Sequence, residues 1–340
     1  MGVAFKSLVV ARPIHLQELG GKSLAIDAHN TLYQFLSIIR QRDGTPLKDA
    51  EGRVTSHLSG LLYRTANLVD VGIKPVYVFD GKPHPLKLHT LEKRKALKKE
   101  AEQEWRAALE AGDMEEALKK AKRTSRIGEQ EVREAQQLLD ALGIPYINAK
   151  GEGEAQAAYM NMKGDVDAVA SQDFDALLFG APVLIRNVTI TGKRKLPDKQ
   201  IWVNISPEEI SLSKVLEEHG IDREQLVDIG ILVGTDFNEG IKGIGPKKAL
   251  RLIKEYGSIE KLVNGGKIEG IPEYEEVRNI FLSPSVTEEY TITWREVDEG
   301  KALELLCEKH QFGRERVLHA LEKYKKFAKN FKQRSLFDYQ

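Results

Sequence analysis

Short acidic stretches that follow apolar, strand-like runs constrain the fold of this 340-residue chain most strongly. The five stretches are Ala25-Ile26-Asp27, Val78-Phe79-Asp80, Glu152-Gly153-Glu154, Asp173-Phe174-Asp175 and Val233-Gly234-Thr235-Asp236. Four of them end or closely follow an apolar run. Parallel strands end at one edge of a sheet, and side chains placed there gather together. The pattern therefore predicts an α/β fold with a cluster of carboxylates at one edge of its sheet.

Seven carboxylates in one cluster would repel one another unless cations lie among them. Magnesium and manganese prefer oxygen ligands, and two such ions about 3.5 to 4 Å apart suit in-line attack on a phosphodiester. A single acidic pair is more often a helix cap or a solvated loop, so the specificity lies in the complete set. We therefore predict two Mg²⁺ ions, which Mn²⁺ can replace. The predicted ligands are Asp27, Asp80, Glu152, Glu154, Asp173, Asp175 and Asp236.

The order of apolar runs and helical patterns predicts how the sheet is assembled. Strands are expected over residues 23–28, 74–79, 144–149, 166–171 and 183–190. Helices are expected over residues 57–69, 129–142 and 154–163. We infer one mostly parallel central sheet, flanked by helices and assembled from both halves of the chain around a long insertion.

That insertion, residues 82–126, carries 13 Lys and Arg against 8 Asp and Glu, a net charge of +5. Gly112 interrupts it, and Asp113 with Glu116 forms a capping box that starts the second of two predicted helices. One face of the first helix can pack, through Leu97, Ala101 and Trp105. Another stripe is basic, with Lys87, Arg94 and Lys98.

Two interpretations of the insertion are open. A charge run is usually only a solvated face, which would make it a helical hairpin in water. Alternatively, its basic stripe grips a polyanionic substrate. Because the insertion directly follows Asp80 and is thus tethered above the predicted metal site, we favour a substrate-gripping arch.

A glycine-rich turn, residues 243–248, lies between two further predicted helices. Its glycines allow backbone N–H groups to approach a phosphate, and Pro246 at a first helical position directs the next helix N-terminus the same way. The alternative is an ordinary turn between packed helices. The neighbouring lysines favour helix-hairpin-helix binding to a DNA backbone. The candidate residues are Gly243, Gly245, Lys247 and Lys248.

Composition sets further bounds. The chain has 51 Lys and Arg and 51 Asp and Glu, so attraction for a polyanion must come from local patches. The single cysteine, Cys307, excludes an intrachain disulfide and fits a reducing compartment. No apolar run approaches the roughly 18 residues that span a bilayer, and we expect no signal peptide and no membrane partner.

The order and spacing of these motifs resemble those of the flap endonuclease family of structure-specific 5′ nucleases. The resemblance covers nearly the whole chain, and its compact length with a short tail is similar to that of archaeal members. The segments that carry it are residues 26–28, 33–36, 55–60, 77–83, 151–157, 171–175 and 243–247. We therefore expect the central sheet to carry a helical arch insertion and a helix-hairpin-helix DNA-binding subdomain.

The resemblance implies an enzyme that cuts branched DNA near the junction of a single-stranded 5′ flap, by two-metal-ion hydrolysis. It also implies 5′ to 3′ exonuclease activity and roles in lagging-strand replication and DNA repair. One ion would be held by Asp80, Glu152 and Glu154, and the other by Asp173, Asp175 and Asp236. Asp27 would act through metal-bound water. At the base of the arch, Lys87 and Arg94 would steer and neutralise the scissile phosphate.

Further residues are candidates for DNA contact. Tyr33 resembles the family aromatic that stacks on a base as the duplex end unpairs, and a half-buried core tyrosine is an equally good interpretation. Backbone contacts are expected from Arg64, Lys98, Lys193 and Arg194. For Lys193 and Arg194, a solvated hairpin explains the basic run nearly as well.

The tail, residues 333–340, resembles the peptide that docks on replication sliding clamps. Its expected anchors are Gln333, Leu336 and Tyr339. Gln340 stands where a second aromatic residue is usual, so we expect weaker binding to a PCNA-type clamp. A flexible or helical linker is the alternative for the whole tail. The family also implies a monomer in the cytoplasm, associated with the nucleoid.

These observations predict six segments. They are an N-terminal nuclease part (1–81), a basic helical arch (82–128), an internal nuclease part (129–236), a helix-hairpin-helix region (222–285), a C-terminal helical region and linker (286–332), and a clamp-binding tail (333–340). Two other functions stay open. A related 5′ to 3′ exonuclease or excision-repair nuclease would share the catalytic core, and a noncatalytic junction-binding scaffold would share the arch and hairpin but not need the carboxylates.

Overall fold

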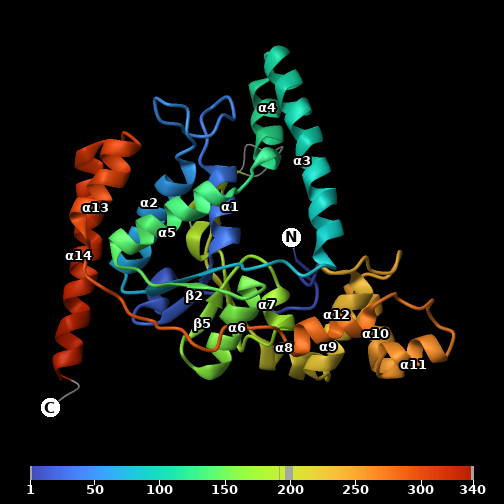
Figure 1. The fold of residues 1–340 in the computed structure, drawn as a ribbon. Helices are drawn as coiled ribbons and strands as arrows, with labels where there is room; N and C mark the ends of the chain where they lie inside the picture. The colour runs from blue at the N-terminus through green and yellow to red at the C-terminus, as the bar shows by residue number, and fades with distance from the viewer. Residues whose placement is uncertain (1, 191, 196–201, 338–340) are drawn as a thin grey trace.

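The computed structural model describes residues 2–190, 192–195 and 202–337, and a seven-stranded sheet forms its centre (Figure 1). The strand order is β1-β9-β6-β5-β2-β3-β4. The strands are β1 (Arg12–Pro13), β2 (Ser23–Asp27), β3 (Lys74–Phe79), β4 (Tyr146–Asn148), β5 (Ala168–Ala170), β6 (Val183–Arg186) and β9 (Glu208–Ser211). A separate antiparallel hairpin pairs β7 (Gly192–Lys195) with β8 (Trp202–Ile205).

The five strands from β4 to β6 are parallel, and β9 and β1 extend the sheet antiparallel at one edge. This confirms a mostly parallel central sheet built from both halves of the chain. One strand prediction was partly wrong. The run over residues 183–190 ends as a strand at Arg186 because Asn187 has a left-handed φ of 62°, and Val188–Ile190 form a 3-10 helix.

Both faces of the sheet are buried, as a parallel sheet requires. Along β2, Leu24 and Ile26 point into one core and Ala25 into the other. The helices on the first side include α1 (Ala28–Ile38), α2 (Ser56–Asp70), α5 (Glu129–Leu142), α13 (Glu299–Leu303) and α14 (Arg314–Phe337). The other side has α6 (Gly153–Lys163), α7 (Asp175–Leu178), α8 (Leu212–His219) and α9 (Arg223–Val233).

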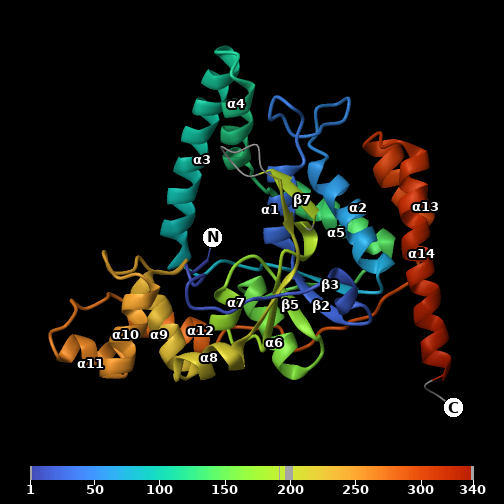
Figure 2. The same cartoon turned by 180° about the vertical axis from the view of Figure 1, so that it is seen from behind.

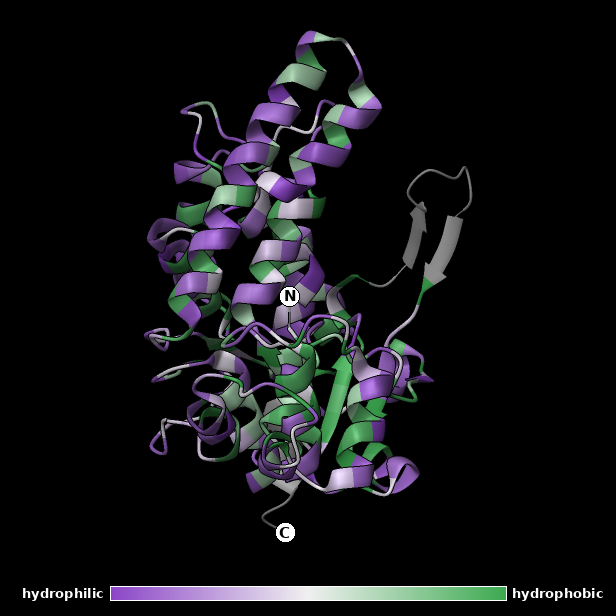
Figure 3. Ribbon diagram, turned by 90° about the vertical axis from the view of Figure 1, so that its right-hand side faces the viewer, coloured by the Kyte–Doolittle hydropathy of each residue, from purple (hydrophilic) through white to green (hydrophobic). Residues whose placement is uncertain are grey.

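The insertion forms two helices that rise above the sheet, α3 (Lys87–Glu110) and α4 (Met114–Ala121) (Figure 1). The predicted start of α4 is confirmed, since the Asp113 side chain accepts a hydrogen bond from the Glu116 N–H at 3.0 Å. Ala101 is buried as expected. Leu97 is 53% exposed, so its predicted packing was wrong. The arch is mainly hydrophilic (Figure 3). Because it stands above the sheet, the apolar side chains of α3 cannot all pack against a core.

Four helices at the other end of the sheet form the predicted helix-hairpin-helix region, in which α9 ends at Val233 and α10 begins at Pro246. The helices beyond α9 are α10 (Pro246–Tyr256), α11 (Ile259–Asn264) and α12 (Tyr274–Leu282). At the opposite end, α14 lies beside α2 in both views (Figures 1 and 2), where the Tyr324 hydroxyl donates to the Leu62 carbonyl at 2.7 Å. Within the described ranges, no helix is both long and apolar enough to cross a bilayer.

Candidate active site

The seven predicted ligands, called the site carboxylates below, lie near the carboxyl ends of neighbouring parallel strands. Asp27 ends β2 and is the N-cap of α1, where its Oδ1 accepts from the Asn30 N–H at 2.9 Å. Asp80 follows β3, Glu152 and Glu154 begin α6 after β4, Asp173 and Asp175 follow β5, and Asp236 follows α9. The strand order β5-β2-β3-β4 thus gathers them at one edge.

The pKa values of three site carboxylates show that negative charge is in excess at this edge. Burial raises the pKa of Asp27 to about 8, and the charge of Asp80 adds to the effect. Burial and the nearby Asp236 raise the pKa of Asp175 to about 7. The pKa of Glu154 is also raised well above its usual value, by burial and by Asp175 and Asp173. Each of these carboxylates would gain from an added cation.

Two basic side chains from the arch reach the site carboxylates. Lys87 contacts Glu152 and lies 3.8 Å from Asp236, between its Nζ and Oδ2. Arg94 contacts Asp236 through Nη2. Burial alone would lower the pKa of Lys87, but Glu152 and Asp80 raise it above its usual value. The predicted pair at the base of the arch therefore lies against the site.

The donor set fits a divalent ion such as Mg²⁺ by its chemistry, because every predicted ligand offers carboxylate oxygens. The raised pKa values fit as well, since burial and then repulsion between the carboxylates disfavour their charged forms. Among the described residues, no three His, Cys, Asp or Glu side chains are arranged as ready ligands of one ion. In this structure Glu152 contacts Lys87 and Asp236 contacts Arg94.

Hydrogen-bond partners that the sequence analysis did not assign hold the site carboxylates. The Ser171 hydroxyl donates to Glu154 Oε1 at 2.7 Å and accepts from the Asp173 N–H at 3.2 Å. The Asn30 amide donates to Asp173 Oδ2 at 2.9 Å. Gln34 Nε2 in turn donates to Asn30 Oδ1 at 2.6 Å. Asn30 follows Asp27 at the spacing of a helix cap, and this is the one sequence signal that could have identified it.

Tyr33 and Lys98, two of the predicted DNA contacts, lie together where the arch meets α1. Tyr33 is half-buried, and Lys98 Nζ lies 4.9 Å from the centroid of its ring. Both earlier interpretations of Tyr33 therefore stay open. Arg64 is half-buried on α2. Lys193 and Arg194 belong to β7 by their backbone, and their side chains lie outside the described residues.

The turn before α10 has the predicted open geometry. Gly243 has a φ of 82°, which favours glycine, and a Cβ at either Gly243 or Gly245 would meet no atom within 4 Å. Pro246 is at the start of α10, as predicted. Lys247 and Lys248 are exposed, and Lys248 Nζ lies 3.4 Å from the Gly243 carbonyl. The turn leaves room for a phosphate at the N-terminus of a helix.

The tail is described only in part. Gln333 and Leu336 belong to the backbone of α14, and their side chains lie outside the described residues. Tyr339 lies outside them altogether. The clamp-binding anchors therefore stay predictions.

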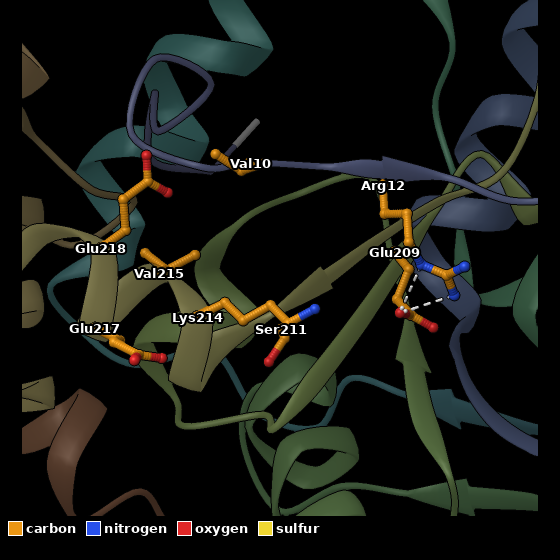
Figure 4. Close-up of a pocket in the computed structure, with 8 residues that line it drawn as sticks. All are labelled: Val10, Arg12, Glu209, Ser211, Lys214, Val215, Glu217 and Glu218. Atoms are coloured by element: carbon orange, nitrogen blue, oxygen red, sulfur yellow. Dashed lines mark hydrogen bonds and ion pairs between the residues drawn. The ribbon is translucent and has the colours of Figure 1, made fainter.

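Two surface hollows differ in their relation to the site. One lies beside Asp80 and is lined by His29, whose Nδ1 accepts from the Asp80 N–H at 3.1 Å. The other lies at the β1–β9 edge, where Arg12 pairs with Glu209 at 3.1 Å (Figure 4). None of the residues that line this second hollow is a predicted site residue.

Comparison with known proteins identifies the family. The chain matches the XPG N-terminal domain over residues 3–101 and the XPG I-region over residues 143–236. It is 55% identical over 325 residues to Flap endonuclease 1 of Archaeoglobus fulgidus, covering 96% of each chain. It is 52% identical over 337 residues to Flap endonuclease 1 of Pyrococcus furiosus, covering 99% of this chain and 98% of the relative.

Solved structures agree with these matches. Flap endonuclease-1 from Methanococcus jannaschii superimposes with a TM-score of 0.77 at 39% identity, covering 97% of this chain and 99% of that one. The catalytic core of Rad2 in complex with DNA substrate shares the fold at 23% identity, with a TM-score of 0.72, covering 95% of this chain and 100% of that one. With identity above 50% over nearly its full length and the same fold, the chain belongs to the flap endonuclease family.

Proposed function

We propose that this protein is a structure-specific 5′ flap endonuclease that cuts branched DNA near the junction of single strand and duplex. The observation that carries the proposal is a cluster of carboxylates in direct contact with Lys87 and Arg94 of a basic arch. Basic side chains attract a DNA backbone, so a phosphodiester held by the arch lies next to the carboxylates. The archaeal relatives named Flap endonuclease 1 support the same activity.

The site carboxylates would hold two Mg²⁺ ions, with Mn²⁺ as a substitute. Asp80, Glu152 and Glu154 are assigned to one ion, and Asp173, Asp175 and Asp236 to the other. Asp27 would act on these ions indirectly, through water. When bound, the ions supply an activated water and stabilise negative charge on the phosphate. The raised pKa values of Asp27 and Asp175 support this assignment, because burial and neighbouring carboxylates disfavour their charged forms and an added cation favours them.

Lys87 and Arg94 orient and neutralise the scissile phosphate. Both side chains already face carboxylate oxygens, and a phosphate between arch and site offers similar acceptors. The planar guanidinium of Arg94 suits two phosphate oxygens at once, whereas Lys87 acts as a point charge. The two residues therefore act on the substrate at different atoms.

The remaining DNA contacts hold the duplex and the tail recruits the enzyme. The open turn with Gly243, Gly245, Lys247 and Lys248 grips a DNA backbone without reading sequence. Tyr33 stacks on an unpaired base, and Arg64, Lys98, Lys193 and Arg194 supply backbone contacts. The tail docks a monomer of this protein on a PCNA-type sliding clamp during lagging-strand replication and repair. This activity belongs in the cytoplasm, at the nucleoid.

Cleavage of a labelled double-flap DNA tests the proposal. With Mg²⁺, the product should end at the junction, and excess chelator should abolish cutting. Cleavage rates on flap, nicked and bubble DNA are then compared. The comparison measures how much of the activity is exonuclease and distinguishes a flap endonuclease from an excision-repair nuclease. Binding without cutting in either Mg²⁺ or Mn²⁺ would instead favour a noncatalytic junction-binding scaffold.

A variant of one site carboxylate locates the activity. Asp173→Ala should abolish cleavage and leave flap binding in chelator largely intact. The matched control is Glu218→Ala, which removes an exposed carboxylate at the hollow on the β1–β9 edge and should cut like the unmodified protein. Unimpaired cleavage by Asp173→Ala would remove Asp173 from the mechanism.

A further inference from the structure

The loop between β5 and α7 carries two site carboxylates, Asp173 and Asp175, within three residues. Asp175 is anchored, because its Oδ1 accepts from the Val3 N–H at 2.6 Å and it begins α7. Asp173 lies between two residues, Gln172 and Phe174, that are in no regular element. The Asp173 N–H donates to Ser171 Oγ at 3.2 Å, and the position of its main chain depends further on what holds those two neighbours.

Arg186, at the end of the adjacent strand β6, holds both neighbours. Its Nε donates to the Gln172 carbonyl at 3.2 Å. Its guanidinium carbon lies 4.5 Å from the centroid of the Phe174 ring, the geometry of a cation–π contact. The remaining edge of the guanidinium faces Glu208 on β9, with 3.4 Å between Nη1 and Oε2. One side chain thus contacts the loop immediately before and immediately after Asp173.

The sheet fixes where Arg186 stands. Ala170, the last residue of β5, pairs with Ile185 of β6. Arg186 follows Ile185 and therefore lies opposite the start of the loop that follows β5. The strand ends directly afterwards, at Asn187 with its left-handed φ of 62°. The Phe174 ring is 7% exposed, and the Arg186 side chain is 20% exposed. The contact is therefore largely shielded from water, which strengthens a cation–π pair.

Arginine suits this position for a physical reason. A guanidinium is flat, so it can stack on a ring with its face while its edge donates hydrogen bonds to a carbonyl. An ammonium group has no face to stack and cannot make both contacts in this geometry.

We propose that Arg186 is a positioning residue that holds the Asp173 carboxylate in place for divalent-ion binding. Its side chain contacts the Gln172 carbonyl, the Phe174 ring and Glu208, so it acts through the loop that carries Asp173. The inference rests on the metal site of the proposed function. Residues that support metal ligands in this way typically change metal affinity or activity by about 10–100-fold when replaced.

The test measures metal binding separately from cleavage, with three variants. Arg186→Met keeps the aliphatic stem but loses the stacking and the hydrogen bond. Arg186→Lys keeps the charge without the flat face. Glu208→Gln is the matched control, since it removes the ion pair and leaves both contacts with the loop. Mn²⁺ affinity is measured by the paramagnetic resonance of free Mn²⁺, flap-DNA affinity in chelator by fluorescence anisotropy, and single-turnover cleavage as a function of Mg²⁺.

The expected result is a loss of Mn²⁺ affinity of about 10-fold for Arg186→Met, a similar loss for Arg186→Lys, and less than about 2-fold for Glu208→Gln. Flap-DNA affinity in chelator should change less than about 2-fold in all three. The Mg²⁺ concentration for half-maximal cleavage should rise in parallel with the loss of Mn²⁺ affinity. Unchanged Mn²⁺ affinity in Arg186→Met would overturn the proposal.

Two further outcomes are distinguishable. If flap-DNA affinity in chelator falls while Mn²⁺ affinity is kept, Arg186 contacts DNA and the proposal is overturned. If the unmodified protein neither binds Mn²⁺ nor cuts, the proposed function itself fails, and the inference fails with it. Should Arg186→Met not fold, Phe174→Leu replaces it, because loss of the ring should weaken Mn²⁺ binding by the same route.

Discussion

Two groups of acidic side chains in this protein contain buried carboxylates but differ in charge balance. The site carboxylates include Asp27 and Asp175, whose pKa values are raised to about 8 and about 7. The other group, called the buried pair below, consists of Asp49 in the α1–α2 connection and Glu134 on α5. Both members of the buried pair have pKa values lowered to about 2. The pKa values of these buried carboxylates are therefore shifted in opposite directions in the two groups.

The difference lies in the partners. Burial would raise the pKa of Asp49, but hydrogen bonds from Arg53 and His310 outweigh it, with 2.7 Å to Arg53 Nε and 3.0 Å to His310 Nδ1. Burial would likewise raise the pKa of Glu134, but His57 and Gln130 outweigh it. The distance between His57 Nε2 and Glu134 Oε2 is 3.3 Å. Here the protein supplies the compensating donors from its own chain.

The comparison separates a structural cluster from a functional one. The buried pair joins the α1–α2 connection, α2, α5 and the segment after α13 through its hydrogen bonds and ion pairs. At the site carboxylates, contacts with Lys87 and Arg94 leave four pKa values raised, those of Asp27, Glu152, Glu154 and Asp175. A buried cluster whose negative charge is not fully compensated lowers the stability of the folded state unless a cation from solution binds to it. The direction of the pKa shift thus distinguishes the two roles.

The strongest way to break this comparison is to neutralise one member of each group. Asp175→Asn should lower cleavage by roughly 10³-fold or more, because a metal ligand is lost. In chelator, the same variant should be more stable than the unmodified protein by about 1–3 kcal/mol, since repulsion is relieved. Cleavage of double-flap DNA and thermal unfolding in chelator measure the two effects.

Asp49→Asn is the matched control for that experiment. It should lower stability and leave cleavage close to that of the unmodified protein, because Asp49 contacts Arg53 and His310 and not the site. If Asp175→Asn were less stable than the unmodified protein in chelator, the site carboxylates would not carry uncompensated repulsion, and the distinction between the two groups would be lost.

The pH dependence of stability sharpens the comparison. Asp27 and Asp175 have raised pKa values, so between about pH 4 and pH 8 the folded state binds more protons than the unfolded state. Their ionisation therefore lowers the free energy of unfolding as pH rises through that window. The buried pair has lowered pKa values, so its stabilisation is complete above about pH 4.5 and is lost only as pH falls toward 2.

In chelator, ionisation of Asp27 and Asp175 should therefore lower the free energy of unfolding by about 6 kcal/mol between pH 5 and pH 8. Saturating Mg²⁺ should remove most of this loss. The difference between thermal unfolding curves in chelator and in Mg²⁺ isolates the contribution of the site, because the rest of the protein is the same in both measurements. Equal stability with and without Mg²⁺ at pH 8 would contradict the prediction.

Sequence reasoning succeeded where function follows from local order along the chain. Six of the site carboxylates end or follow a strand or begin a helix, and Asp236 follows helix α9. The parallel sheet and the gathering of Asp27, Asp80 and Asp173 therefore follow from alternating strand and helix patterns. The helix start at Asp113 and the turn before Pro246 are also local features, and the structure has both.

Contacts between segments distant in the chain were not predictable in the same way. Arg186 reaches Phe174 only because β5 and β6 pair in one register. In the sequence, His57 is an ordinary residue of a predicted helix. Its contact with Glu134 depends on how α2 packs on α5. The exposure of Leu97 depends on how far the arch stands from any core. Such features require the packed structure, because periodicity identifies a face but not the residues it meets.

The smallest expected effect comes from the buried pair itself. Glu134→Gln removes a charge that His57 and Lys309 face, at 3.3 and 3.5 Å. We expect it to lower the free energy of unfolding by about 2 kcal/mol at pH 7, after allowance for solvent screening. Cleavage should stay within about threefold of the unmodified protein where both are folded. Denaturant unfolding monitored by tryptophan fluorescence gives the stability change.

Glu129→Gln, an exposed glutamate on the same helix, is the control and should change stability by less than about 0.5 kcal/mol. A cleavage defect in Glu134→Gln without loss of stability would assign Glu134 a role in catalysis. The direction of its pKa shift argues against such a role. A carboxylate already satisfied by donors from its own chain has little to gain from an ion or a phosphate, and neutralising it should therefore affect the fold before the chemistry.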